Sequence, residues 1–204
     1  MRPAIISYTP ADDDTDGFAN DVNTTAGNPF TLAATSAGDG MAHLVIITPS
    51  GSVTGNYTLT GTDADGKAQT ETVATSTTNP VTSTKYFLTL TQVLAPAGIG
   101  ANTVNIGWTD DAISPTYPID WPSPEAANIF VDITGTIDFT VQQNFANVLA
   151  GEAGSWNAIT ALAAKTADTY GQAAIGATAF RLLVNSLTAG ATVTIYTDQP
   201  VRGW

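Results

Sequence analysis

The feature that most constrains this fold is an alternation of side chains over residues 129–145. Apolar residues and one glycine occupy nearly all odd positions, and Asp, Thr, Gln and Asn occupy most even ones. A β-strand turns successive side chains to opposite faces, so this pattern predicts extended chain with one face in a core. The simplest interpretation is one long strand bent at Gly135. A tight turn near residues 134–136 would also keep the apolar residues at odd positions, and this alternative stays open.

Short runs rich in threonine and β-branched residues recur elsewhere, separated by Gly, Asn, Asp and Pro, which favours strands and turns. Residues 63–66 end in Asp-Gly and predict a hairpin turn, because both residues tolerate a positive φ. Residues 85–94 are apolar on both sides and indicate one central strand. Only residues 155–165, with Ser155 as N-cap, indicate a helix. The remaining predicted strands cover residues 41–48, 57–60, 68–73, 104–108, 179–187 and 192–197.

A proline-rich stretch at residues 114–124 interrupts these patterns. Proline cannot donate to a strand ladder and disfavours helix before it, so the stretch is interpreted as a semi-rigid linker. A proline-rich ligand for another protein is the alternative. The predicted fold is all-β: two antiparallel β-sandwich domains, jelly-roll or immunoglobulin-like, with at most one short helix. The domains are residues 1–113, with an extended N-terminal arm, and residues 125–204.

Charge excludes several classes of partner. The formal net charge is −12, and only six residues are basic. These six are scattered, whereas binding to a phosphate backbone needs clustered Lys and Arg. We therefore expect neither a nucleic acid nor an anionic membrane as a partner. The acidic surface suits solubility or a basic protein partner.

The chain has no cysteine, which excludes disulfides, thiolate zinc sites, iron–sulfur clusters and cysteine nucleophiles. The first residues contain no apolar stretch long enough for a signal peptide, and no segment reaches the length of a membrane span. We therefore expect the chain to fold in the cytoplasm.

Catalytic motifs are missing from the sequence. His43 is the single histidine, and no Gly-x-Ser-x-Gly motif is present, so a Ser-His-Asp triad is not expected. His43 is interpreted as a strand residue that faces solvent or a neighbour. Glu71 and Glu152 are among the carboxylates that a glycoside hydrolase could use, but no motif pairs them. The chain is not expected to be an enzyme, and no organic cofactor is expected.

The sharpest local motif is the acidic run over residues 12–17. Asp12, Asp14, Asp16 and Gly17 match the opening of a calcium loop, in which glycine permits a tight turn around several oxygen ligands. The twelfth position is Asn23 instead of a bidentate glutamate. Asp12, Asp14 and Asp16 are thus candidate ligands of calcium in a loop other than an EF-hand. The alternative is a solvated acidic loop.

The residues that carry a family resemblance lie at 57–67, 69–73, 83–87, 102–108, 134–143, 156 and 178–182. Together they resemble virion structural proteins of tailed bacteriophages. The resemblance implies a non-catalytic part of a symmetric assembly, located in the virion and folded in the cytoplasm of the bacterial host. The preferred role is a capsid decoration, or cement, protein on the capsid surface, which binds the junctions between capsid subunits and stabilises the shell. Its partners would be the major capsid protein and copies of itself, for example in a trimer.

Two other roles stay open. The first is a tail, neck or fibre component of the same virion. The second is a carbohydrate-binding β-sandwich on the virion surface, with exposed Trp121 or Trp156 as a platform for sugars.

Aromatic side chains are the candidate contact residues, because interfaces are enriched in them. The candidates are Tyr8, Phe18, Phe30 and Trp204, and ordinary core packing is the alternative for each. The terminal stretches 1–30 and 200–204 are expected to act as arms that reach a neighbouring subunit.

Overall fold

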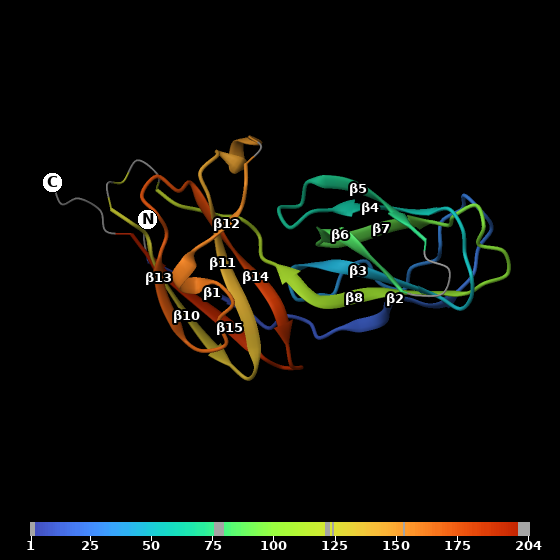
Figure 1. Ribbon diagram of the computed structural model, residues 1–204, viewed down its shortest axis with the longest axis horizontal. Coiled ribbons are helices and arrows are strands. Elements are labelled where there is room, and N and C mark those ends of the chain that lie inside the picture. The colour runs from blue at the N-terminus through green and yellow to red at the C-terminus, as the bar shows by residue number, and fades with distance from the viewer. Residues whose placement is uncertain (1–2, 76–79, 121–122, 124, 153, 200–204) are drawn as a thin grey trace. The chain divides into compact units, whose positions relative to one another are not determined.

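The computed structural model describes residues 3–75, 80–120, 123, 125–152 and 154–199, which form strands and connecting loops (Figure 1). The pairings between strands are antiparallel, so the predicted all-β class is confirmed. Two 3-10 turns, η1 (Val148–Ala150) and η2 (Thr160–Leu162), are the helical elements of the described chain. No helix in this part is long and apolar enough to cross a membrane.

The chain divides into two compact units. One unit combines Met1–Pro10 with Ile113–Trp204, and the other is Ala11–Ala112. We call them the terminal unit and the inserted unit, because the second interrupts the sequence of the first. This division differs from the predicted domain of residues 1–113. The N-terminal strand belongs with the C-terminal half because its backbone pairs there.

Two sheets form the terminal unit (Figure 1). The first sheet has the order β1 (Ala4–Tyr8), β15 (Thr192–Asp198), β10 (Asn128–Thr134), β13 (Thr169–Gln172). The second contains β12 (Asn157–Ala158), β11 (Ile137–Asn144), β14 (Ala179–Leu187) and β9 (Tyr117–Pro118). In the first sheet, Ala4 lies opposite Thr197 in the β1–β15 pair. The predicted N-terminal arm is therefore wrong for residues 4–8, which are an edge strand.

The alternating run is divided between these two sheets. β10 lies in the first sheet and β11 in the second, so the prediction of one bent strand is wrong. Gly135 turns the chain with φ +85°, at the position of the alternative turn. The apolar side chains stay at odd positions on both sides of the turn. Those that are fully buried are Ile129, Val131, Ile137, Phe139 and Val141, whereas Phe145 is exposed and the polar Asn144 is buried.

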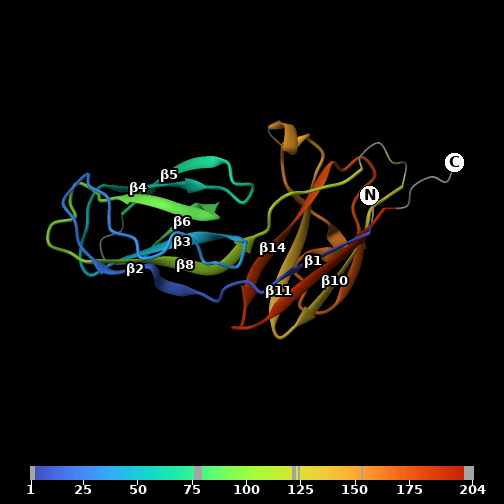
Figure 2. The ribbon, with the colours of Figure 1, turned by 180° about the vertical axis from the view of Figure 1, so that it is seen from behind.

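The inserted unit also has two groups of strands, which Figure 2 shows as separate layers. One contains β6 (Val81–Phe87), β3 (Ala42–Pro49), β8 (Val104–Ile113) and β2 (Asp14–Val22). The other has the order β5 (Ala68–Ala74), β4 (Asn56–Thr62), β7 (Thr89–Leu94). Side chains from both groups share one hydrophobic core, for example Ile47 and Ile106 with Leu59 and Val93.

Residues 85–94 were predicted as one strand, and this is wrong. The strand is interrupted at Leu88: β6, before it, pairs with β3, and β7, after it, pairs with β4. The amide N–H of Leu88 donates to the carbonyl oxygen of Thr62. Buried positions pass from Phe87 to Leu90, so burial moves from odd to even positions at the break, and it returns to odd positions at Val93 after a register shift in the β4–β7 pairing. Two half-buried strands in different sheets thus imitate one strand that is apolar on both faces.

The proline-rich stretch belongs to the terminal unit where the structure describes it. Tyr117 pairs with Phe180 in the β9–β14 ladder, and their rings stack with centroids 5.3 Å apart. Ile119 is buried, and its N–H donates to the oxygen of Thr178. These contacts make residues 117–119 part of the fold, in contrast to the predicted linker. Trp121, Pro122 and Pro124 lie outside the described residues.

The helix predicted over residues 155–165 is also wrong. This segment contains β12 and η2, and its backbone bonds run to β11. The N–H of Ile159 donates to Val141, and the N–H of Lys165 donates to Phe139. Ile159 and Leu162 are buried. Their helical spacing reflects two anchor points on a neighbouring strand, and isolated helices of this length are marginal.

The predicted hairpin at residues 63–66 is confirmed between β4 and β5. Asp63 Oδ1 accepts hydrogen bonds from the amides of Asp65 and Lys67, both at 2.9 Å. Gly66 has φ +76°, a conformation that costs a residue with a Cβ atom.

We predict that Gly61→Ala destabilises the inserted unit more than Gly66→Ala. A Cβ atom on Gly61 would lie 1.9 Å from the backbone oxygen of Thr89, and such overpacking should cost about 3 kcal/mol. A Cβ atom on Gly66 meets nothing within 4 Å, so only its left-handed φ is penalised, by about 1 kcal/mol. Urea unfolding followed by tryptophan fluorescence measures both costs. Equal costs, or the reverse order, would contradict the packing argument.

Candidate functional site

His43 is a buried strand residue with both ring nitrogens engaged. Nδ1 lies 2.9 Å from the carbonyl oxygen of Thr109, and Nε2 lies 2.8 Å from Asp39 Oδ2. The carbonyl oxygen of Thr109 can only accept, so Nδ1 donates in that bond, and Nε2 is engaged by the Asp39 carboxyl group. The prediction that His43 faces a neighbour is confirmed. Neither nitrogen is left to activate a nucleophile.

Asp39 is the anchor of this cluster. Its Oδ2 also accepts the N–H of Ala11 at 2.8 Å, and Oδ1 accepts the N–H of Met41 at 3.0 Å. Burial raises the pKa of Asp39, but the hydrogen bond and charge of His43, with the two backbone N–H groups, lower the pKa below its ordinary value. The carboxylate thus ties the start of the inserted unit to β3.

The two glutamates considered for hydrolysis are held by local bonds. Glu71 accepts the N–H groups of Thr84 and Lys85 at 2.7 and 2.9 Å. Glu152 accepts the N–H of Asn147 at 2.9 Å. Each carboxylate therefore stabilises a nearby backbone segment.

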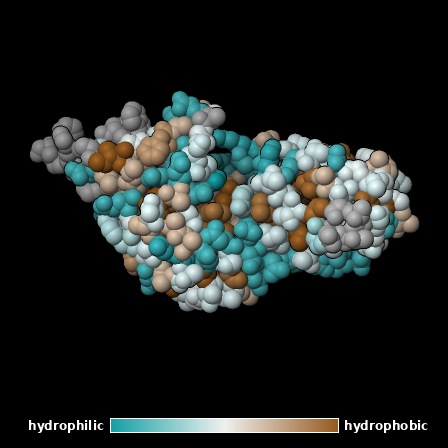
Figure 3. Space-filling model, in the orientation of Figure 1, coloured by the Kyte–Doolittle hydropathy of each residue, from teal (hydrophilic) through white to brown (hydrophobic). Residues whose placement is uncertain are grey.

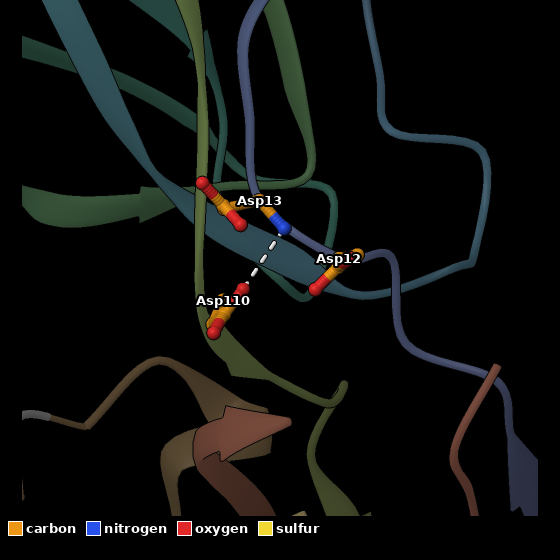
Figure 4. A group of neighbouring side chains, drawn as sticks. All are labelled: Asp12, Asp13 and Asp110. Carbon is orange, nitrogen blue, oxygen red and sulfur yellow. Dashed lines mark hydrogen bonds between the residues drawn. The ribbon is translucent and has the colours of Figure 1, made fainter. Parts of the chain in front are cut away.

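The structure gathers three aspartates, although not the predicted three. Figure 4 shows Asp12, Asp13 and Asp110, whose carboxylates offer oxygen atoms within 4.8 Å of one another. The N–H of Asp13 donates to Asp110 Oδ1 at 2.8 Å. Asp12 and Asp13 are exposed, and Asp110 is half-buried.

Asp14 and Asp16, in β2, are not members of this group. The N–H of Asp16 donates to Asp14 Oδ1, and the hydrogen bond with Asp14, followed by burial and the charge of Asp14, raises the pKa of Asp16. Gly17 has no left-handed φ; a Cβ atom there would lie 2.3 Å from the ring of Trp108. The structure thus groups Asp12 with Asp13 and Asp110, and not with Asp14 and Asp16 as expected for a calcium loop, and Gly17 makes room for an indole ring.

The predicted contact residues are mostly not at the surface. Phe18 and Phe30 are 1% and 4% exposed and belong to the core of the inserted unit, so the interface prediction is wrong for both. Phe18 packs edge-on against Trp108. Tyr8 is half-buried and shares a hydrogen bond with the hydroxyl of Tyr117. Trp204 lies outside the described residues.

Exposed hydrophobic side chains have a distribution that the sequence analysis missed. The view in Figure 3 shows hydrophobic groups in separate areas among hydrophilic ones. Every large hydrophobic residue that is exposed in the described chain belongs to the terminal unit. These residues are Ile5, Phe130, Phe145, Tyr170, Ile175 and Tyr196.

Four of them form one row across the first sheet of the terminal unit. Tyr196 lies opposite Ile5 on one side and opposite Phe130 on the other, and Phe130 lies opposite Tyr170. The rings of Phe130 and Tyr196 have centroids 6.0 Å apart. We call this set the aromatic row. It forms part of the lining of a surface hollow of about 440 Å³.

A row of polar side chains runs beside the aromatic row, two residues along each strand. Asn128 lies opposite Asp198 and Gln172. Its Oδ1 accepts from the hydroxyl of Tyr170 at 2.6 Å and from Gln172 Nε2 at 2.8 Å. Its Nδ2 donates to Asp198 Oδ1 at 2.9 Å. We call Asn128, Gln172 and Asp198 the polar row.

The two remaining exposed residues lie on loops of the terminal unit that are bonded together. Phe145 follows β11 and is 50% exposed, and Ile175 precedes β14 and is 64% exposed. The N–H of Thr178 donates to Asn144 at 2.8 Å, and the N–H of Ala174 donates to Gln143 Oε1 at 2.7 Å. We call Phe145 and Ile175 the loop pair.

Trp156 does not offer a free face as a sugar platform. The guanidinium of Arg181 lies 4.3 Å from its ring centroid, and the side chain is half-buried. Trp121, the other candidate, lies outside the described residues. The exposed rings of the described chain are those of the aromatic row and Phe145.

We predict that Asp39→Asn lowers the stability of the inserted unit at neutral pH by about 2 kcal/mol, because a buried carboxylate loses its charge-assisted hydrogen bonds. The contribution of Asp39 is present above its unfolded pKa of 3.8 and is lost as the pH falls through its lower folded pKa. Urea unfolding across this range should show the gap between variant and wild type closing in acid. Asp65→Asn, in an exposed turn, is the control. A gap that stays constant in acid would refute the proposed charge effect.

We also predict that Asp12→Asn stabilises the inserted unit by about 0.5 kcal/mol at low ionic strength, because it relieves repulsion among three carboxylates. The gain should shrink in about 0.5 M salt, where screening is strong. Thermal unfolding at both ionic strengths measures it, and Asp65→Asn controls for the same change in net charge. A destabilised variant would show that the cluster is held together by something other than its own backbone bonds.

Comparison with known proteins gives no relative from which a role could be transferred. No protein-family model matches the chain, and no curated protein or solved structure matches it. The functional argument therefore starts from the surface groups of the terminal unit.

Proposed function

We propose that this chain is a non-catalytic structural protein of a tailed-phage virion, and specifically a capsid decoration protein. The proposal starts from the sequence resemblance and is carried by one observation. Phe145 and Ile175, two of the large hydrophobic side chains exposed in the terminal unit, lie on loops that are joined by hydrogen bonds. Exposed apolar side chains held in this way suit a surface that binds another macromolecule.

We propose the loop pair as the contact with the capsid. Phe145 and Ile175 are apolar side chains on loops that are fastened together, so both can be presented without ordering a flexible segment. Because the two side chains are 50% and 64% exposed, burying them fully is worth about 2–3 kcal/mol before the cost of association. That is modest for one copy, and many copies on one shell would add avidity.

The sheets of each unit fit the same role. We propose that both units are β-sandwiches, because each has two sets of paired strands with buried side chains between the exposed faces. His43 and the two glutamates serve the fold through their bonds, which agrees with a protein that acts by contact. A tail, neck or fibre component would use the same properties at a lower copy number.

We predict that quantitative mass spectrometry of purified particles finds this chain at a fixed large fraction of the number of major capsid subunits. Decoration of every capsid junction requires that stoichiometry. A ratio of a few per cent or less would move the chain to the tail or fibres. Complete absence from particles would overturn the virion assignment.

A second measurement tests the loop pair. Particles stripped of the chain are incubated with the purified protein, and bound copies are counted after sedimentation. The double variant Phe145→Ser with Ile175→Ser should lose at least tenfold in affinity, equivalent to about 1.4 kcal/mol. Tyr170→Ser, which removes an exposed ring from the aromatic row, is the matched control and should bind like wild type. Equal binding by all three proteins would refute the assignment of the loop pair.

A further inference from the structure

We infer that the hollow over the aromatic row is a binding site for an uncharged glycan. This inference goes beyond the proposed function and does not depend on it, since it uses the aromatic row and not the loop pair. Its first support is size. The hollow has a volume of about 440 Å³, within the range of about 300–1,000 Å³ that small-molecule sites occupy.

The floor of the hollow has the chemistry of a sugar platform. Ile5, Tyr196, Phe130 and Tyr170 come from four adjacent strands, whose spacing is about 4.8 Å. The row therefore spans about 14 Å, room for two or three sugar rings end to end. The three rings are 39–54% exposed. The C–H faces of a pyranose carry a slight positive charge and pack favourably on the negative face of an aromatic ring.

The polar row supplies partners for sugar hydroxyl groups. Asn128 holds Gln172, Asp198 and the hydroxyl of Tyr170 through three hydrogen bonds, so these side chains are oriented before a ligand arrives. A carboxylate can accept about four hydrogen bonds, and Asp198 uses one lone pair of Oδ1 for Asn128. Preorganised acceptors beside an apolar floor favour a ligand with both C–H faces and O–H donors.

Charge selects among glycans. Among the described residues that line the hollow, Asp198 is the one charged side chain, and none is Lys or Arg. A sulfate, phosphate or uronate group would meet this carboxylate with no cation from the described lining to offset it. The site therefore fits a neutral glycan better than an acidic one.

A protein partner fits the same surface less well. A stable protein interface buries about 800 Å² per partner and is depleted in charge at its centre. The aromatic row is a single line of four side chains, with a preassembled amide and carboxylate network directly beside it. This arrangement suits a narrow ligand that stacks and bonds at once.

The test measures binding affinity by isothermal titration calorimetry of the full chain. The neutral probes are hexasaccharides of glucose, mannose and N-acetylglucosamine, and polygalacturonate is the acidic probe. At least one neutral hexasaccharide should bind, and polygalacturonate should bind more weakly. Phe130→Ala and Tyr170→Ala should each reduce that affinity about tenfold, the size of one lost stacking contact. Tyr170→Phe keeps the ring and should retain most of the affinity, which separates lost stacking from misfolding.

Controls keep this proposal separate from the proposed function. The double variant Phe145→Ser with Ile175→Ser should bind the hexasaccharide like wild type, whereas Tyr170→Ala should still bind stripped particles. Failure of every neutral probe to bind would overturn the inference, as would affinity unchanged by Phe130→Ala and Tyr170→Ala. Loss of particle binding or self-association in these two variants, without glycan binding, would assign the row to a protein partner instead.

Discussion

The pairing of β1 with β15 is the interaction on which the rest of this structure depends. It joins residues from near the two ends of the sequence and makes Ala11–Ala112 an insertion within another folded unit. The same pairing completes the four-stranded sheet and brings Ile5 to the end of the aromatic row. Without β1, the edge of β15 would present unpaired backbone groups, and the hollow would lose the part of its lining that Ala4 and Ile5 provide.

Local patterns predicted burial well, because burial follows from the period of a strand. Within residues 129–145, burial was predicted correctly at Ile129, Val131, Ile137, Phe139 and Val141 but not at Phe145, which is exposed. The turn at Asp63–Gly66 was also predicted correctly. The connections between sheets were not predicted correctly. A chain that bends within one sheet and a chain that crosses to another sheet at Gly135 keep the same parity, so periodicity cannot separate them. The break at Leu88 shows the converse, since two half-buried strands resembled one central strand.

The candidate site was harder to predict than the fold, for a related reason. Phe130 and Tyr196 are aromatic residues at the outward parity of their strands, and this signal is visible in the sequence. Their assembly into one row with Tyr170 depends on the register of β10, β13 and β15, which are distant in sequence. Aromatic identity alone misled the analysis at Phe18 and Phe30, because core and interface both favour such residues. The acidic run failed similarly, since Asp110 joins Asp12 only through the folded chain.

The insertion has a consequence for how the chain folds during synthesis. β1 leaves the ribosome before the inserted unit, yet its partner β15 is made only after the whole inserted unit. Contacts between residues so far apart in sequence form late, because closing the long loop costs entropy before the contacts can stabilise the fold. The inserted unit has a hydrophobic core of its own, which can form before β15 is made. Once it has formed, the flexible chain between β1 and β15 is effectively shorter. Until then β1 is an unpaired strand that β15 of another copy could capture, so crowded synthesis favours strand-exchanged oligomers.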